Sequence, residues 1–302
     1  LRALGTPADI LQDATQYARI ILIAMPGLFV FLLATAMLRG VGDTVTPLYT
    51  LLISAGIGLV LTPALIRGWA GLPQLGVASG AAATVVSFVV ATTWLGWRLV
   101  RLHSPLAPGR AFAAHLRIDL TLLRGVLRVG VPTGVQMIVI SLAELALLGL
   151  VNGYGSQATA AYGAVNQVVA YVQFPAISIA ITTSILGAQA IGAGRLHTLG
   201  AIVRTALWMN VVLTGALVLL GYLFSRMLMG FFITDPAVIE VAQELLHIML
   251  WSTVIFGMAS ALSGIMRASG AVLVPTGIAI ACIALVEVPA AWLLSQKYGL
   301  RG

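Results

Sequence analysis

Two matching stretches decide the fold of this chain: Ala36-Met-Leu-Arg-Gly-Val-Gly-Asp-Thr-Val-Thr-Pro47 and Gly264-Ile-Met-Arg-Ala-Ser-Gly-Ala-Val-Leu-Val-Pro275. One shift along the chain, without a gap, superposes Arg39 on Arg267, Gly42 on Gly270 and Pro47 on Pro275. These landmarks stay in register although most aliphatic residues between them differ. The pattern predicts an internal repeat, in which the two stretches end equivalent helices.

The sequence around both stretches is strongly apolar. Of 302 residues, 60% are hydrophobic and 8% are charged, whereas a soluble domain carries about 25% charged residues. About 20 apolar residues suffice to cross the hydrocarbon core as a helix. We therefore expect an all-α polytopic membrane protein. Its eight predicted spans are 17–38, 48–66, 76–100, 128–150, 158–186, 199–224, 243–266 and 272–294.

Basic residues concentrate in one polar segment, 98–128, where six arginines accompany a single acid, Asp119. Cytoplasmic loops carry an excess of Lys and Arg, so this segment is predicted to be cytoplasmic. Alternation of the spans then places the turns that contain Arg39, Arg195 and Arg267 on the same side. Membrane topology thus explains the net charge of +7, and we expect no nucleic-acid partner, which would need an exposed basic face.

The repeat also predicts the domain organisation. Residues 1–100 are expected to form the C-terminal half of a first transmembrane lobe, 101–125 a cytoplasmic linker, and 126–302 most of a second lobe. The shift keeps cytoplasmic turns cytoplasmic, so the repeat is parallel, with its axis along the membrane normal. Two six-helix lobes then follow, and the eight spans correspond to helices 4 to 11. The first three helices and the last one are expected to lie outside these residues.

Three motifs resemble those of the multidrug and toxic compound extrusion (MATE) transporters. The stretch 38–47 resembles the signature that ends the fourth MATE helix, and Gly130-Val-Pro-Thr-Gly-Val-Gln136 resembles the entry to the seventh. Residues 161–167 and 187–195 are similar to the eighth helix and the loop after it. The resemblance implies V-shaped lobes around a central cavity, with alternating access driven by Na⁺ or H⁺.

Two acids within the apolar spans are the first candidates for a cation or substrate site. An ionisable group in the hydrocarbon region is costly and therefore a functional candidate. Glu144 lies deep in the span 128–150, where the MATE resemblance implies a cavity-facing glutamate; the alternative is a structural hydrogen bond to a neighbouring helix. Glu287 lies toward the outer side of the last span and either lines the cavity or reaches interfacial water. A desolvated carboxylate can exchange a proton near neutral pH, and an ionised one can balance a cationic drug.

Polar residues within the span 158–186 are further candidates. Asn166 and Gln173 are seven residues apart and share one helix face, while Gln167 and Tyr171 are four apart and share another. Two interpretations stay open, namely hydrogen bonding between helices and lining of the cavity.

The repeated stretch itself supplies the gating or motif residues Arg39, Gly42, Asp43, Pro47 and Arg267. Arg39 and Arg267 end equivalent spans, where a cation is favoured by the helix dipole. Asp43 is close enough in sequence to pair with Arg39 in the same turn.

Other function classes receive less support. An integral membrane enzyme would need a nucleophile with a neighbouring base, but the chain has no Gly-x-Ser-x-Gly and no His-Glu-x-x-His. A lipid-linked oligosaccharide or lipid flippase of the same superfamily would be expected to present cations to an anionic headgroup. A passive channel does not account for the two-lobe repeat. We therefore expect a monomeric secondary exporter of small organic, mostly cationic, compounds in the bacterial plasma (inner) membrane, without cofactor or metal, coupled to Na⁺ or H⁺.

Overall fold

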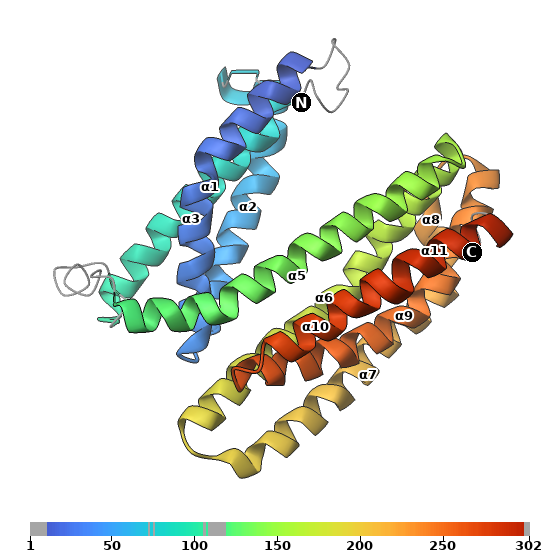
Figure 1. Ribbon diagram of the computed structural model, residues 1–302. Helices are drawn as coiled ribbons and strands as arrows, with labels where there is room; N and C mark the ends of the chain where they lie inside the picture. Colours follow the sequence, from blue (N-terminus) through green and yellow to red (C-terminus); the bar gives the residue numbers. More distant parts are fainter. Residues whose placement is uncertain (1–10, 72, 75, 105–106, 108–118, 299–302) are drawn as a thin grey trace. The chain divides into compact units, whose positions relative to one another are not determined.

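The computed structural model describes residues 11–71, 73–74, 76–104, 107 and 119–298, and every regular element in these ranges is helical (Figure 1). Eight helices are long and apolar enough to cross a membrane, which confirms the eight predicted spans. The chain divides into two compact units, Leu1–Ile118 and Asp119–Gly302. Most of the predicted linker, residues 105–106 and 108–118, lies outside the described residues, so the predicted domain boundaries stay a prediction.

Unit 1 contains three long helices, α1 (Leu11–Gly40), α2 (Val45–Arg67) and α3 (Ala78–Arg101), with a short 3₁₀ turn at Trp69–Gly71. Helix α3 packs against both α1 and α2. It can do so because its buried face contains many small residues, including Ala81, Ala83 and Ala91, which have no exposed surface. Small side chains let helix backbones approach closely in a membrane, where the hydrophobic effect does not drive helices together.

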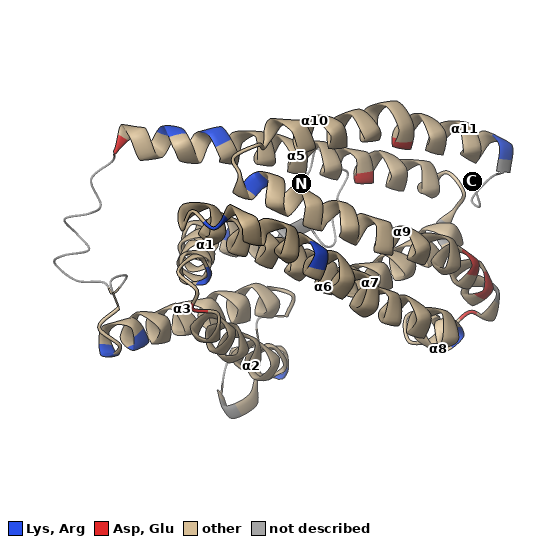
Figure 2. Cartoon of the chain, turned by 90° about the horizontal axis from the view of Figure 1, so that it is seen from below, with Lys and Arg blue, Asp and Glu red and all other residues tan. Residues whose placement is uncertain are grey.

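Unit 2 contains the remaining helices. They are α5 (Leu120–Asn152), α6 (Ser156–Gly192), the 3₁₀ turn Leu196–Thr198, α7 (Leu199–Leu223), α8 (Ser225–Gly230), α9 (Pro236–Ala268), α10 (Leu273–Cys282), a π-helical segment (Ile283–Glu287) and α11 (Val288–Tyr298). The long helices carry few charged residues along their length (Figure 2).

The core of unit 2 lies between α6 and α9. The buried face of α6 repeats at helical spacing, for example Ala161, Val165, Val168 and Val172, as expected for one stripe of an α-helix. Gly264 of α9 lies directly on α6, because a β-carbon at that position would stand 2.5 Å from the backbone oxygen of Ala180. This interface therefore depends on side-chain size rather than on polarity.

Helix α5 forms a pair with the last helices of the chain. Thr276 Oγ1 of α10 donates to Gln136 Oε1 of α5 at 3.4 Å, and the Tyr154 hydroxyl, just after α5, donates to the Ser295 carbonyl oxygen of α11 at 2.7 Å. The partners are 140 and 141 residues apart, so α5 and α10–α11 run parallel. Figures 1 and 2 both show them side by side.

Helices extend beyond the predicted apolar spans where polar residues continue or cap the helix. Helix α5 begins at Leu120, well before the predicted span, because the Asp119 carboxylate caps it and accepts from the Thr121 and Leu122 N–H groups at 2.8 and 3.4 Å. Such a cap lies outside the apolar run, and hydropathy does not register it.

Candidate functional site

The turn that carries the motif residues joins α1 to α2. Gly42 adopts a left-handed conformation, with φ of 93°. Its N–H donates to the Arg39 carbonyl oxygen at 3.1 Å, and the Asp43 N–H donates to the Leu38 carbonyl oxygen at 3.0 Å. This pair of hydrogen bonds is the Schellman motif, which ends helices at a glycine. Arg39 lies in the last turn of α1, where its charge opposes the negative end of the helix dipole.

Asp43 lies two residues before α2, and its side chain accepts a hydrogen bond from the first turn of that helix. Its Oδ1 accepts from the Thr46 N–H at 3.0 Å. Burial opposes ionisation of this carboxyl, but hydrogen bonds from Thr46 and Val45 and the charge of Arg98 outweigh it, so the pKa of Asp43 lies below its ordinary value of 3.8. Among the described residues, Arg98 of α3 is thus the charged group that favours ionised Asp43, and no ion pair joins Asp43 to Arg39. Pro47 lies buried in the first turn of α2, where a missing N–H costs nothing.

The turn between α9 and α10 repeats this geometry. Gly270 has φ of 79°; its N–H donates to the Arg267 carbonyl oxygen, and the Ala271 N–H donates to the Met266 carbonyl oxygen, both at 3.0 Å. These are the positions that the sequence repeat aligns with the first turn. The shared pattern supports equivalence of the two turns, while the repeat of whole lobes stays a prediction. Ala271 replaces Asp43, so the second turn lacks the carboxylate cap.

Glu144 and Glu287 lie at nearly the same level of the α5 and α10–α11 pair. The two hydrogen bonds between these helices align residue i of α5 with a residue 140 or 141 positions later. Glu144 is therefore level with residues 284–285, and Glu287 is offset from it by about 4 Å along the axis at 1.5 Å per residue. Both side chains are exposed. The fold thus places two carboxylates that are far apart in sequence at a similar level of neighbouring helices.

Glu287 ends the π-helical segment Ile283–Glu287. The Val288 N–H donates to the Ile283 carbonyl oxygen, five residues earlier, and Pro289 follows directly. Proline has no N–H, and its ring clashes with the carbonyl four residues before it, so a wider turn relieves the clash. Such π-helical turns are rare in proteins overall, but those that occur often lie at functional sites. Pro289 is visible in the sequence, but hydropathy could not reveal the π-turn itself.

The polar residues of α6 do not join this pair through hydrogen bonds. Asn166, Gln167 and Tyr171 are exposed, and Gln173 is half-buried. Within the described part of the chain, none of these four side chains hydrogen-bonds to another helix. Tyr171 instead contacts Phe174 of its own helix, with ring centroids 6.0 Å apart. Their exposure leaves them free to line a cavity, but their role stays a prediction.

Comparisons with known proteins agree with the resemblance to MATE transporters that the sequence motifs indicated. The MatE family model matches residues 1–64 and 132–293. The chain is 44% identical over 296 residues to the probable multidrug resistance protein YoeA of Bacillus subtilis, covering 98% of this chain and 64% of YoeA. The chain thus spans somewhat less than two thirds of the length of this relative.

Solved structures share the fold. The Vibrio cholerae MATE transporter VcmN in its bent form superposes with a TM-score of 0.85 at 18% identity, over 100% of this chain and 67% of that one. A MOP-superfamily transporter from Pyrococcus furiosus, described as having a binding pocket of reverse polarity, gives 0.88 at 20% identity, over 100% and 66%. With helices, turn motifs and relatives in agreement, this multi-pass membrane chain belongs to the MATE family.

Proposed function

We propose that this protein is a secondary active multidrug exporter, which moves small organic, mostly cationic, compounds out of the cell by alternating access. It works as a monomer in the bacterial plasma membrane and carries out no covalent chemistry. Its family membership and a relative named as a probable multidrug resistance protein support this proposal.

The observation that carries the proposal is the level placement of Glu144 and Glu287 on neighbouring parallel helices. Two carboxylates at one depth concentrate negative charge within an apolar span, which attracts a cation and repels an anionic headgroup. Their exposure makes both reachable from outside the helix pair. An anionic, lipid-linked cargo would instead need cationic side chains at this level.

We propose Na⁺ or H⁺ as the coupling ion, taken up at the same carboxylates. Carboxylate oxygens bind hard cations, and a carboxylate in an apolar site also exchanges protons. Competition between the coupling ion and a cationic drug for one pair of acids provides antiport, because occupation by one excludes the other.

The test is dye efflux by Glu144→Gln, expressed from the complete gene in a drug-sensitive bacterium. Efflux of a fluorescent cationic dye is followed under an imposed Na⁺ gradient and, separately, under a H⁺ gradient. Wild type is expected to export under one gradient, which identifies the ion, and Glu144→Gln is expected to lose export at normal membrane levels. The matched control is Glu240→Gln, since Glu240 is an exposed glutamate near the start of α9.

Two outcomes would contradict the proposal. If Glu144→Gln and Glu240→Gln both export like wild type, Glu144 does not bind the cation or the drug. If wild type moves no cationic dye under either gradient, an anionic or lipid-linked cargo becomes the better interpretation.

A further inference from the structure

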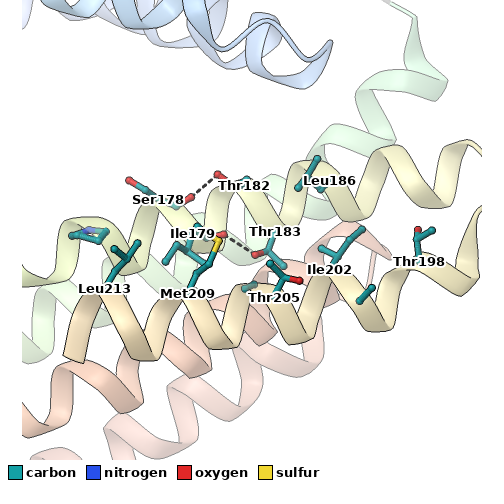
Figure 3. Close-up of a pocket in the computed structure, with 13 residues that line it drawn as sticks. Ser178, Ile179, Thr182, Thr183, Leu186, Thr198, Ile202, Thr205, Met209 and Leu213 are labelled. Atoms are coloured by element: carbon teal, nitrogen blue, oxygen red, sulfur yellow. Dashed lines mark hydrogen bonds between the residues drawn. The ribbon is translucent and has the colours of Figure 1, made fainter. Parts of the chain in front are cut away.

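A groove of about 610 Å³ lies between α6 and α7, and neither Glu144 nor Glu287 is among the residues that line it. Ser178, Thr182 and Leu186 of α6 and Ile202, Thr205 and Met209 of α7 converge on it (Figure 3). Its volume falls in the range of small-molecule sites. No proposed step of transport uses it.

The walls of the groove are mostly apolar. Thr182 Oγ1 donates to the Ser178 carbonyl oxygen at 2.9 Å, and Thr183 Oγ1 donates to that of Ile179 at 2.7 Å. The hydroxyl protons of Thr182 and Thr183 are therefore engaged within their own helix. The walls otherwise present mainly methyl groups and the Met209 thioether, with the exposed hydroxyls of Ser178 and Thr205 as further polar groups. Leu186 and Met209 are 45% and 47% exposed, so the groove is open along one side. An apolar chain fits such a surface better than a ligand that needs hydrogen bonds.

The groove has the length of one bilayer leaflet. Its α6 wall runs from Pro175 to Leu186, about 16 Å at 1.5 Å per residue, which is roughly half of a 30 Å hydrocarbon core. Its α7 wall ends at Thr198, in the turn after α6. The Thr198 N–H and Oγ1 both contact the Arg195 carbonyl oxygen, at 3.1 and 2.7 Å, so the arginine belongs to the closing turn of the groove.

The part of the chain that forms the groove carries charge of one sign only. The sequence contains no Asp or Glu between Glu144 and Asp235. Within this acid-free stretch, Arg195 and His197 occupy the turn at the end of the groove, and both are exposed. The positive-inside rule predicts this turn to be cytoplasmic, and the cytoplasmic leaflet carries the anionic lipids.

We propose that this groove binds a phospholipid with an anionic headgroup: one acyl chain lies between α6 and α7, and the phosphate contacts Arg195 and His197. Basic pockets between transmembrane helices on the cytoplasmic side recognise anionic headgroups. The lipid site does not require the protein to export drugs, and it would persist in a Glu144→Gln variant.

The test is native mass spectrometry of the complete purified protein, titrated with phosphatidylglycerol or with phosphatidylcholine of the same chains. Wild type is expected to retain phosphatidylglycerol preferentially. Arg195→Gln is expected to weaken phosphatidylglycerol retention roughly fivefold, because one cation near the membrane surface contributes about 1 kcal/mol to binding of an anionic lipid. Retention of phosphatidylcholine is expected to stay unchanged. The matched control is Arg226→Gln, because Arg226 is an exposed cation just beyond the opposite end of α7.

A second pair of variants tests the acyl-chain groove. Thr182→Trp fills the groove and is expected to lower retention of both lipids, whereas Ile181→Trp, at an exposed position outside it, is expected to retain them. Unfolding midpoints equal to wild type show that the variants are folded. Equal retention of the two lipids by wild type, or unchanged retention in Thr182→Trp, would overturn the lipid site. If wild type forms dimers and Thr182→Trp is monomeric, the groove binds a second copy of the chain instead of a lipid.

Discussion

Gly257 of α9 makes room for the buried amide of Asn210 of α7, because a β-carbon at position 257 would overlap the Asn210 side chain. Asn210 has no exposed surface. Its Nδ2 donates to the Val254 carbonyl oxygen at 3.2 Å, and its Oδ1 accepts from Thr214 Oγ1 at 3.1 Å. One missing methyl group thus allows a polar clamp between two membrane helices.

Gly257→Ala is expected to destabilise the protein by about 1–3 kcal/mol, since overpacking forces Asn210 out of its hydrogen bonds. Thermal unfolding of the purified protein measures the loss. Gly215→Ala on α7 is the control, because its new β-carbon meets nothing within 4 Å. Adding Asn210→Ala to Gly257→Ala should recover part of the loss through coupling. Equal midpoints for Gly257→Ala and Gly215→Ala would refute the overlap.

Gly42→Ala and Gly270→Ala are expected to lower stability by similar amounts, about 1–2 kcal/mol each, since both positions need a left-handed backbone. Gly40→Ala, with open space at its β-carbon, is the control and should be neutral or slightly stabilising. The unfolding midpoints of the three variants report the comparison. A loss in only one of the two turns would show that they are not equivalent.

Asp43→Ala is expected to cost about 0.5–2 kcal/mol at pH 7, as for other helix caps. The pKa of Asp43 is lowered in the folded protein from its ordinary value of 3.8, so its stabilisation is complete above that value and disappears as the pH falls through the lower folded value. Unfolding midpoints of wild type and Asp43→Ala should therefore converge in acid. Thr44→Ala is the control, because Thr44 makes no side-chain cap. A gap that stays constant down to about pH 2, below the usual titration range of a carboxyl, would argue against an ionised cap.

Glu287→Gln is expected to reduce cationic dye efflux about tenfold or more, and to act non-additively with Glu144→Gln, because groups that bind one ion as a unit lose most of the function when either is removed. Initial efflux rates of wild type, both single variants and the double variant form the cycle. Independent, multiplicative losses would mean that the two acids serve separate sites.

Local sequence features accounted for the membrane architecture. The length of each apolar run is a property of contiguous residues, and a lipid environment forces such runs into helices because every backbone group must be hydrogen-bonded internally. The spacing of Arg39, Gly42 and Pro47 likewise reports one turn, whose glycine is needed for a left-handed backbone. The motifs of the MATE family are of this local kind.

What the sequence by itself determined, then, is eight helices, their turns and their family. Only the tertiary structure decided that Glu144 and Glu287 lie at nearly the same level, that the charge of Arg98 acts on Asp43, and that α6 and α7 leave a groove. These relationships join residues from different helices, some of them far apart in the chain. Helix register across such separations depends on which small residues permit close approach, as at Gly264 and Gly257, and an apolar run has the same hydropathy whichever face it turns to its neighbour.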